Sequence, residues 1–197
     1  LLKEERGISA QGKQDLEIVL SETDRMAALL ERLRTTYQPA SRDEFQLIQM
    51  NDLIEDIFAL LATHLRHNNI SYAYLADPDL PAILGMENQL RQVFLNLVMN
   101  AVDAMAGGGH LTVATQFQSD SDEVLIKITD TGTGIDEDIL PNIFEAFVTN
   151  KAEGTGLGLA ISYEIILKHR GRITAENNPD GGATFNIWLP VSDKGER

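Results

Sequence analysis

Two asparagines lie four residues apart in an apolar helical pattern, where their side chains could serve a metal ion. Asn96 and Asn100 end the run Asn-Leu-Val-Met-Asn, and this spacing puts both side chains on one flank of a helix. Asparagine is a poor helix former and costs about 0.5 kcal/mol relative to alanine at each site. Carboxamide oxygens are hard ligands of the kind that Mg²⁺ prefers. The pair predicts a magnesium site, and two solvent-facing or locally bonded asparagines are the alternative.

A carboxylate follows at the end of an apolar strand pattern. Asp130 comes directly after residues 124–129, and Gly132 and Gly134 follow it. A carboxylate there could accept a hydrogen bond from the adenine amino group, and the glycines would let the backbone approach the base and ribose. An ordinary Asp-Thr-Gly turn is the alternative for this motif taken alone.

Two more glycine motifs come later in the chain. Gly154, Gly156 and Gly158 open an apolar helix pattern, and residues 181–185 precede the last strand pattern. Backbone N–H groups at a helix start form an anion site, and glycines supply the freedom that a lid over phosphates needs. The Gly-x-Gly-x-Gly spacing differs from the dinucleotide fingerprint. A flexible loop before a weakened helix start is the alternative.

Taken together, the four motifs predict an ATP pocket without a P-loop. Lys151 precedes the glycine loop and could reach a phosphate, or it could be an ordinary exposed lysine. Phe144 and Phe147 are expected to anchor the connection on the core. Residues 7–13 imitate a Walker A loop, but Gln14 replaces the required Ser or Thr and no strand precedes them.

Composition limits the partners of the chain. The 197 residues carry a formal net charge of -14, which would repel nucleic acid and also ATP. An ATP site must therefore supply local positive potential from Mg²⁺, a few basic side chains and helix N-termini. The absence of cysteine excludes disulfides and thiolate metal sites. No apolar run approaches the length of a membrane span, and a cytoplasmic location is expected.

Two regions are predicted along the chain. Residues 13–37 form one helix with a heptad seam that needs a partner helix, and a break at 38–41 marks the domain boundary. We assign residues 1–39 to a partial helical hairpin and residues 40–197 to a catalytic domain. The chain starts with Leu1 and is expected to be part of a longer protein.

The second region predicts an α+β fold, a two-layer sandwich with helices on one face of a sheet. Asn51 is expected to cap the first of its helices. Helices are expected over 51–67, 86–105 and 155–168, with a short helical piece near 136–144. Strands are expected over 45–50, 70–76, 110–118, 123–130, 172–177 and 184–190.

With all four motifs in order, residues 45–190 resemble the catalytic, ATP-binding domain of sensor histidine kinases. This family belongs to the superfamily of gyrase, heat-shock chaperone, histidine kinase and mismatch-repair ATPases, so the fold implied is a Bergerat-type sandwich. The resemblance implies that Asn100 ligates Mg²⁺, that Asn96 supports the phosphates and that Asp130 binds adenine with Thr184 nearby. The implied ATP-binding residues are Asn96, Asn100, Asp103, Asp130, Gly132, Gly134, Ile135, Lys151, Gly154, Thr155, Gly156, Leu157, Gly158, Leu159 and Thr184.

The resemblance also separates phosphoryl transfer from hydrolysis. Hydrolytic members of the superfamily carry a glutamate four residues before the magnesium asparagine, as the base for an attacking water. Asn96 occupies that position here, and an amide is a poor proton acceptor. The implied activity is therefore transfer of the γ-phosphate of ATP to a protein histidine, for relay to the receiver domain of a response regulator.

The acceptor histidine of this family is expected upstream of Leu1. None of the four histidines fits the acceptor pattern; His64 and His67 are expected on a solvated helix face, and His110 and His169 are expected to be structural. Residues 1–39 resemble the second helix of the dimerisation hairpin, which implies a homodimer of the full protein. A related protein-serine kinase of the anti-sigma-factor type and a non-catalytic nucleotide-sensing scaffold are the alternatives. No nucleic-acid partner and no membrane contact by this region are expected.

Overall fold

The structure is a computed structural model that describes residues 44–151 and 155–191. The predicted helix over 13–37 and the predicted boundary at 38–41 lie outside these residues. Within them, no helix is long and apolar enough to cross a membrane.

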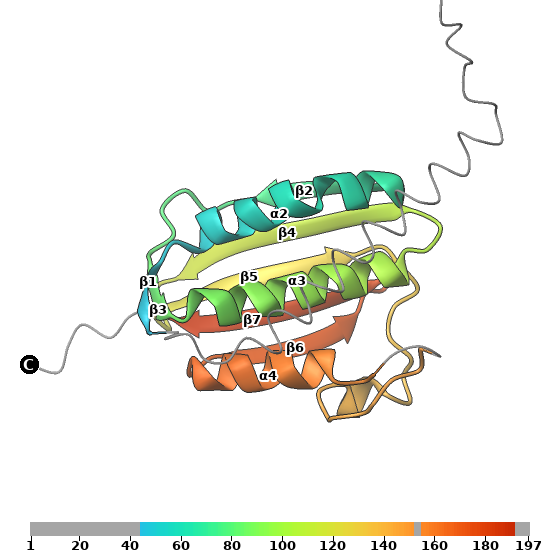
Figure 1. Cartoon of the computed structure of the whole chain (residues 1–197). Coiled ribbons are helices and arrows are strands. Elements are labelled where there is room, and N and C mark those ends of the chain that lie inside the picture. The colour runs from blue at the N-terminus through green and yellow to red at the C-terminus, as the bar shows by residue number, and fades with distance from the viewer. Residues whose placement is uncertain (1–43, 152–154, 192–197) are drawn as a thin grey trace, which may run out of the picture. The chain divides into compact units, whose positions relative to one another are not determined.

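Five strands form one sheet in the order β2-β4-β5-β7-β6 (Figure 1). The outer strand β2 runs parallel to β4, and every other neighbouring pair is antiparallel. A parallel pair needs a crossover connection, and the helix α3 supplies it between β2 and β4. The strands are β2 (Ile70–Leu75), β4 (Gly109–Gln118), β5 (Glu123–Asp130), β7 (Ala183–Pro190) and β6 (Arg172–Asn177).

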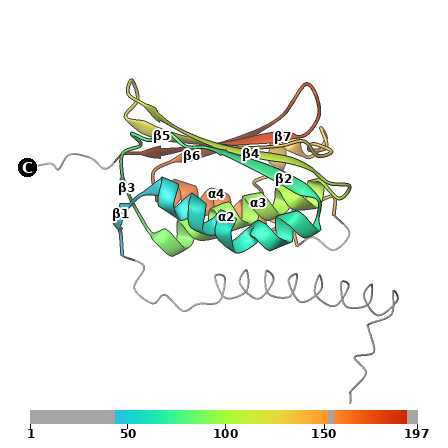
Figure 2. The same ribbon diagram turned by 90° about the horizontal axis from the view of Figure 1, so that it is seen from above.

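Three helices cover one face of this sheet, so the domain has two layers (Figure 2). They are α2 (Met50–His67), α3 (Glu87–Ala104) and α4 (Gly158–Lys168). The helix α3 packs between the other two and contacts both. Because α3 carries the asparagine pair and α4 starts at the glycine loop, this layer brings two of the four motifs together.

The core lies between the sheet and the helices. In β5, Val124, Ile126 and Ile128 face the helices and are almost fully buried, whereas Lys127 is exposed on the opposite face. From α3, Leu97 is fully buried. The alternation along β5 therefore sets which of its side chains point toward the helices.

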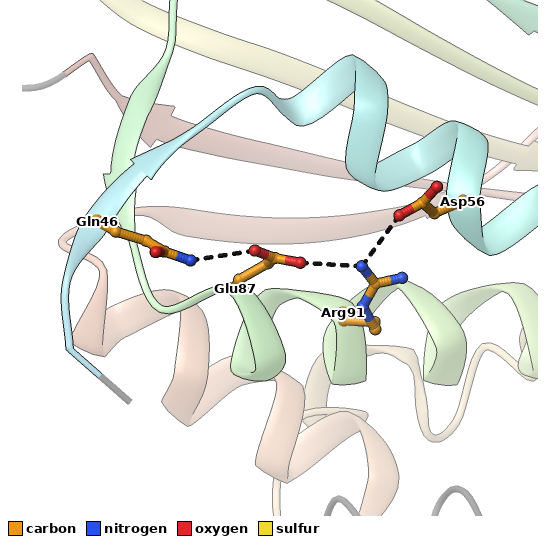
Figure 3. Close-up of polar contacts among 4 residues, drawn as sticks. All are labelled: Gln46, Asp56, Glu87 and Arg91. Atoms are coloured by element: carbon orange, nitrogen blue, oxygen red, sulfur yellow. Dashed lines mark hydrogen bonds and ion pairs between the residues drawn. The ribbon is translucent and has the colours of Figure 1, made fainter. Parts of the chain in front are cut away.

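A polar cluster ties the start of α3 to its neighbours (Figure 3). The amide of Gln46, in the short strand β1 (Gln46–Ile48), donates to Glu87 at 3.1 Å. Arg91 forms ion pairs with Glu87 at 3.0 Å and with Asp56 of α2 at 3.3 Å. These contacts join β1, α2 and α3 at the end of the domain where α3 begins.

The predicted α+β sandwich is confirmed, with differences at short elements. Strand β3 (Ile83–Gly85), which pairs with β1, was not predicted, and the helical piece expected near 136–144 is the three-residue 3₁₀ helix η1 (Leu140–Asn142). Asn51 is not the cap of α2, because Gln49 holds that position. The Asn51 side chain instead donates to the carbonyl of Asp77 at 2.8 Å.

Candidate functional site

The asparagine helix and the glycine-loop helix are joined by buried side chains. The Asn96 amide nitrogen donates to the hydroxyl of Ser162 at 3.0 Å, and that hydroxyl donates to the carbonyl of Gly158 at 3.0 Å. Asn96 is 6% exposed and Ser162 is 1% exposed. Gly158 and Leu159 form the first turn of α4. One side chain of α3 is therefore bonded, through Ser162, to the start of the predicted phosphate-binding helix.

Gly158 leaves no room for a larger residue beside Asn96. A Cβ atom built on Gly158 would lie 2.4 Å from the Oδ1 atom of Asn96, which is closer than real Cβ contacts come. The backbone of α4 thus approaches α3 as closely as a glycine permits. A side chain at the third position of the motif would therefore require the Asn96 amide to move.

The other predicted residues of α3 lie toward its C-terminal end. Asn100 is partly exposed, one turn after Asn96. Asp103 forms an ion pair with Lys151 at 2.8 Å, with side chains that are 45% and 44% exposed. The structure therefore brings the predicted phosphate-binding lysine to the same end of α3 as Asn100. Among the described residues, no group of three or more His, Asp or Glu could hold a metal ion by itself.

Asp130 ends β5 on the face toward the helices and is 3% exposed. Its Oδ1 atom accepts hydrogen bonds from the backbone N–H groups of Gly132 at 2.8 Å and Ala183 at 3.3 Å. Burial raises the pKa of this carboxyl, and the two backbone bonds oppose the rise. Among the described residues both bonds go to Oδ1, so Oδ2 is the oxygen that could accept a bond from a ligand.

Close backbone contacts bring the end of α3 and the last glycine motif to the turn that follows Asp130. A Cβ atom on Gly132 would lie 2.6 Å from the carbonyl oxygen of Ala104, at the end of α3. A Cβ atom on Gly182 would lie 2.0 Å from the carbonyl oxygen of Asp130. The turn after β5 is thus packed between the end of α3 and the last glycine motif.

The next segment is held by an asparagine of β6. The Asn177 side chain accepts a bond from the N–H of Ile135 at 2.7 Å and donates to the carbonyl of Ile135 at 2.7 Å. Gly134, just before it, has φ of +75°. Asn177, which lies outside the predicted set, therefore holds the predicted nucleotide-binding residue Ile135 through both of its backbone groups.

Thr184 is turned away from Asp130. It pairs in register with Thr129, so the Thr184 hydroxyl and the Asp130 carboxylate project from opposite faces of the sheet. The Thr184 hydroxyl lies 2.9 Å from that of Thr129 and donates to Asn178 at 2.7 Å. This corrects the expectation of a Thr184 side chain beside the adenine site, where the backbone of Ala183 lies instead.

The glycine loop is described from Thr155 onward, and Gly154 lies outside the described residues. The carbonyl of Gly156 accepts a bond from the N–H of Phe147 at 3.0 Å. Leu157 is the N-cap residue of α4, which therefore starts three residues later than predicted. The Leu157 N–H is bonded to the Thr155 hydroxyl at 3.4 Å.

The two phenylalanines of the connection behave differently. Phe144 stacks on Tyr163 of α4 with ring centroids 5.4 Å apart, as expected for an anchor. Phe147 is 75% exposed and has φ of +69°, so the prediction that it anchors the connection on the core is wrong. Its backbone is held by Gly156 rather than by burial of the ring.

Sequence reasoning missed two residues that organise the site, Ser162 and Asn177. Ser162 shares a helix face with the buried Ile165 and Ile166, and a polar residue at such a position was the available signal. Asn177 carried no comparable signal, because an asparagine at the end of a strand is common in turns.

Comparisons with known proteins show the family of the chain. A family model described as histidine kinase-, DNA gyrase B- and HSP90-like ATPase matches residues 85–193, more than half of the chain. Sensor protein FixL of Bradyrhizobium diazoefficiens is 36% identical over 171 residues, which are 86% of this chain and 34% of FixL. The chain thus spans about a third of the length of that curated relative.

Solved structures show the same fold. The catalytic domain of histidine kinase ThkA is 30% identical with a TM-score of 0.68, over 76% of this chain and 97% of that domain. ThkA in complex with the response regulator protein TrrA matches 96% of this chain and 53% of that chain, at 24% identity and a TM-score of 0.66. The family can be assigned from the four motifs on this two-layer fold together with these similarities to known proteins. The chain belongs to the histidine kinase-, DNA gyrase B- and HSP90-like ATPases and carries the nucleotide-binding domain of a sensor histidine kinase.

Proposed function

We propose that this chain binds ATP·Mg²⁺ and supplies the γ-phosphate to a histidine that lies outside it. The observation that carries the proposal is the convergence of the motifs: Asp130 and its turn pack against the end of α3, and α4 is bonded to Asn96. Adenine would lie at the Asp130 carboxylate, and the phosphates would lie between the asparagine helix and the glycine loop.

Magnesium fits the donors on α3. Asn100 offers a partly exposed carboxamide oxygen, and Asp103 lies one turn further on. Mg²⁺ in nucleotide sites is bound by few protein oxygens together with substrate phosphates and water. When bound, Mg²⁺ would neutralise phosphate charge.

The residues of the chain would act by position and charge. In the transfer, the bond between the γ-phosphorus and the β–γ bridging oxygen breaks, a bond to an imidazole nitrogen forms, and ADP leaves. Asn96 cannot take a proton from water, and its amide nitrogen is bonded to Ser162. Its chemistry supports transfer rather than hydrolysis.

We infer the phosphate-accepting histidine and the protein that next receives the phosphate from the family of the chain. His169 is buried and bonded through both ring nitrogens, to the Ile165 carbonyl at 2.7 Å and the Met86 N–H at 2.9 Å. It is not an acceptor, and we infer that the acceptor lies on a dimerisation hairpin to which residues 1–39 contribute. A response regulator would receive the phosphate, as the pairing of ThkA with TrrA suggests. Because the reaction uses cellular ATP, we assign this region to the cytoplasm, whether or not the full protein is anchored in a membrane.

The test is ATP binding by Asp130→Asn beside a matched control. Asp77 also accepts backbone N–H bonds, from Asp79 and Phe117, but it follows β2 and lies outside the motifs. Asp130→Asn should weaken ATP binding at least about tenfold, the loss of about 1.4 kcal/mol expected of a charged hydrogen bond. Asp77→Asn should bind as the wild type does. Unchanged ATP affinity in Asp130→Asn, measured by displacement of a fluorescent ATP analogue, would contradict the proposal.

A further inference from the structure

The Ser162 hydroxyl both accepts and donates a hydrogen bond at the contact between α3 and α4. It accepts from the Asn96 amide and donates to the Gly158 carbonyl, each at 3.0 Å. At 1% exposure, water cannot replace either partner. A buried hydroxyl that joins two helices fixes their relative position more strictly than apolar contact does.

The two partners of Ser162 both belong to the phosphate side of the proposed site. Gly158 lies in the first turn of α4, where backbone N–H groups could bind an anion, and Asn96 lies one turn before Asn100. The adenine side has other supports, because Asp130 is bonded to the backbone of Gly132 and Ala183. Loss of the Ser162 hydroxyl would therefore disturb one half of the site and leave the other half intact.

We propose that Ser162 is a positioning residue for phosphate binding: its hydroxyl holds the start of α4 against the Asn96 side chain, at the separation that the phosphates of ATP require. This inference rests on the proposed function. Ser162 itself contacts no substrate atom and acts through Asn96 and Gly158. The contact of Gly158 with Asn96 adds a second constraint at the same place, since a Cβ atom on Gly158 would displace the Asn96 amide that is bonded to Ser162.

The experiment compares ATP with adenosine on Ser162→Ala. Affinity for ATP·Mg²⁺ should fall about tenfold, the change expected on loss of a buried hydrogen bond, whereas affinity for adenosine should stay within about twofold. If Ser162 had only a structural role, its loss would weaken the binding of both ligands alike. The ratio of the two affinities is therefore the quantity to measure. Both can be measured by displacement of a fluorescent ATP analogue.

Two further variants complete the test. Ser162→Cys keeps most of the side-chain volume with a poor hydrogen-bonding group, and it should show the same selective loss even if Ser162→Ala is too unstable to study. Ser71→Ala is the matched control, because it removes a hydroxyl that is bonded to His110 at 2.8 Å on strand β2. It should change neither affinity.

Wild-type ATP affinity in the folded Ser162 variants, or equal losses for ATP and adenosine, would overturn the inference. Failure of the wild-type chain to bind ATP would instead contradict the proposed function, and this inference with it. The two failures are therefore distinguishable in one set of measurements.

Discussion

Asp130 is an acidic side chain that folding places in a buried position at the end of β5. Removal from water raises the pKa of its carboxyl, and the bonds from Gly132 and Ala183 offset part of that effect. A buried carboxylate with one oxygen bonded to the backbone is costly for stability and useful for binding a hydrogen-bond donor. At the scale of single residues, this is the side chain that most directly suggests a ligand.

This cost predicts a pH-dependent effect of Asp130→Asn on stability. Because the folded state raises the pKa, it binds the proton more tightly than the unfolded state. The protonated Asp130 carboxyl therefore contributes stability at pH values below the usual carboxyl pKa. This contribution is lost as the pH rises through the raised pKa of the folded state. Asparagine cannot ionise, so the variant should gain stability relative to the wild type over a pH series that rises from below the usual carboxyl pKa through the raised value.

Urea unfolding of both proteins without nucleotide, over that pH series, measures the difference. If the free energies of unfolding of the variant and the wild type differ by the same amount at every pH, the folded state does not raise the pKa of Asp130. Any loss of ATP binding in the variant would then have a cause other than the loss of a buried charge.

The elements of the domain place three of the four motifs at an element end, whereas the asparagine motif begins near the middle of α3. The asparagines lie in the second half of α3, Asp130 ends β5, the glycine loop starts α4, and Gly182 precedes β7. Close backbone approach joins these ends, and at Gly182 it leaves no room for a side chain, since a Cβ atom would meet the Asp130 carbonyl at 2.0 Å. The site thus depends on glycine at element ends.

Gly182→Ala should therefore destabilise the domain strongly. Its φ of +84° disfavours any other residue, and the clash adds to that strain, so we expect a loss of about 2 kcal/mol or more in the free energy of unfolding. Gly107→Ala is the matched control, since a Cβ there has nothing within 4 Å. Equal stability of the two variants in denaturant titrations would contradict the close contact at Asp130.

Most long elements could be predicted from the sequence, because apolar periodicity and turn residues are local signals. The α3 and α4 helices and the β4, β5 and β7 strands are found where expected within a few residues. The three-residue strand β3 could not be predicted, because its partner β1 lies far away in the sequence. Such short elements depend on tertiary pairing rather than on their own pattern.

The directions of side chains in the site could be established only from the pairing register of the strands. Thr184 lies close to Asp130 along the sheet, but only the pairing of Thr184 with Thr129 reveals that their functional groups face opposite sides. The prediction for Phe147 was wrong for a different reason, because a hydrophobic side chain is expected to be buried and the Phe147 ring is exposed. Ser162 became visible only when the packing of α4 on α3 was known.

The whole molecule carries a formal net charge of -14, and its proposed ligand is also an anion. Few basic side chains lie at the motifs, and Lys151 is paired there with Asp103. Binding of ATP·Mg²⁺ as proposed would therefore rely on backbone N–H groups at the start of α4 and on the bound cation. The proposed dependence on Mg²⁺ would follow from the negative charge of the whole chain.

The proposed ATP·Mg²⁺ site is tested by calorimetric titration of the chain with ATP, once with Mg²⁺ and once with the metal removed by a chelator. We expect saturable binding of one ATP per chain in Mg²⁺, and an affinity at least about tenfold weaker without the metal, a difference of about 1.4 kcal/mol. The absence of saturable binding in Mg²⁺, or equal affinity with and without the metal, would contradict an ATP·Mg²⁺ site at these motifs.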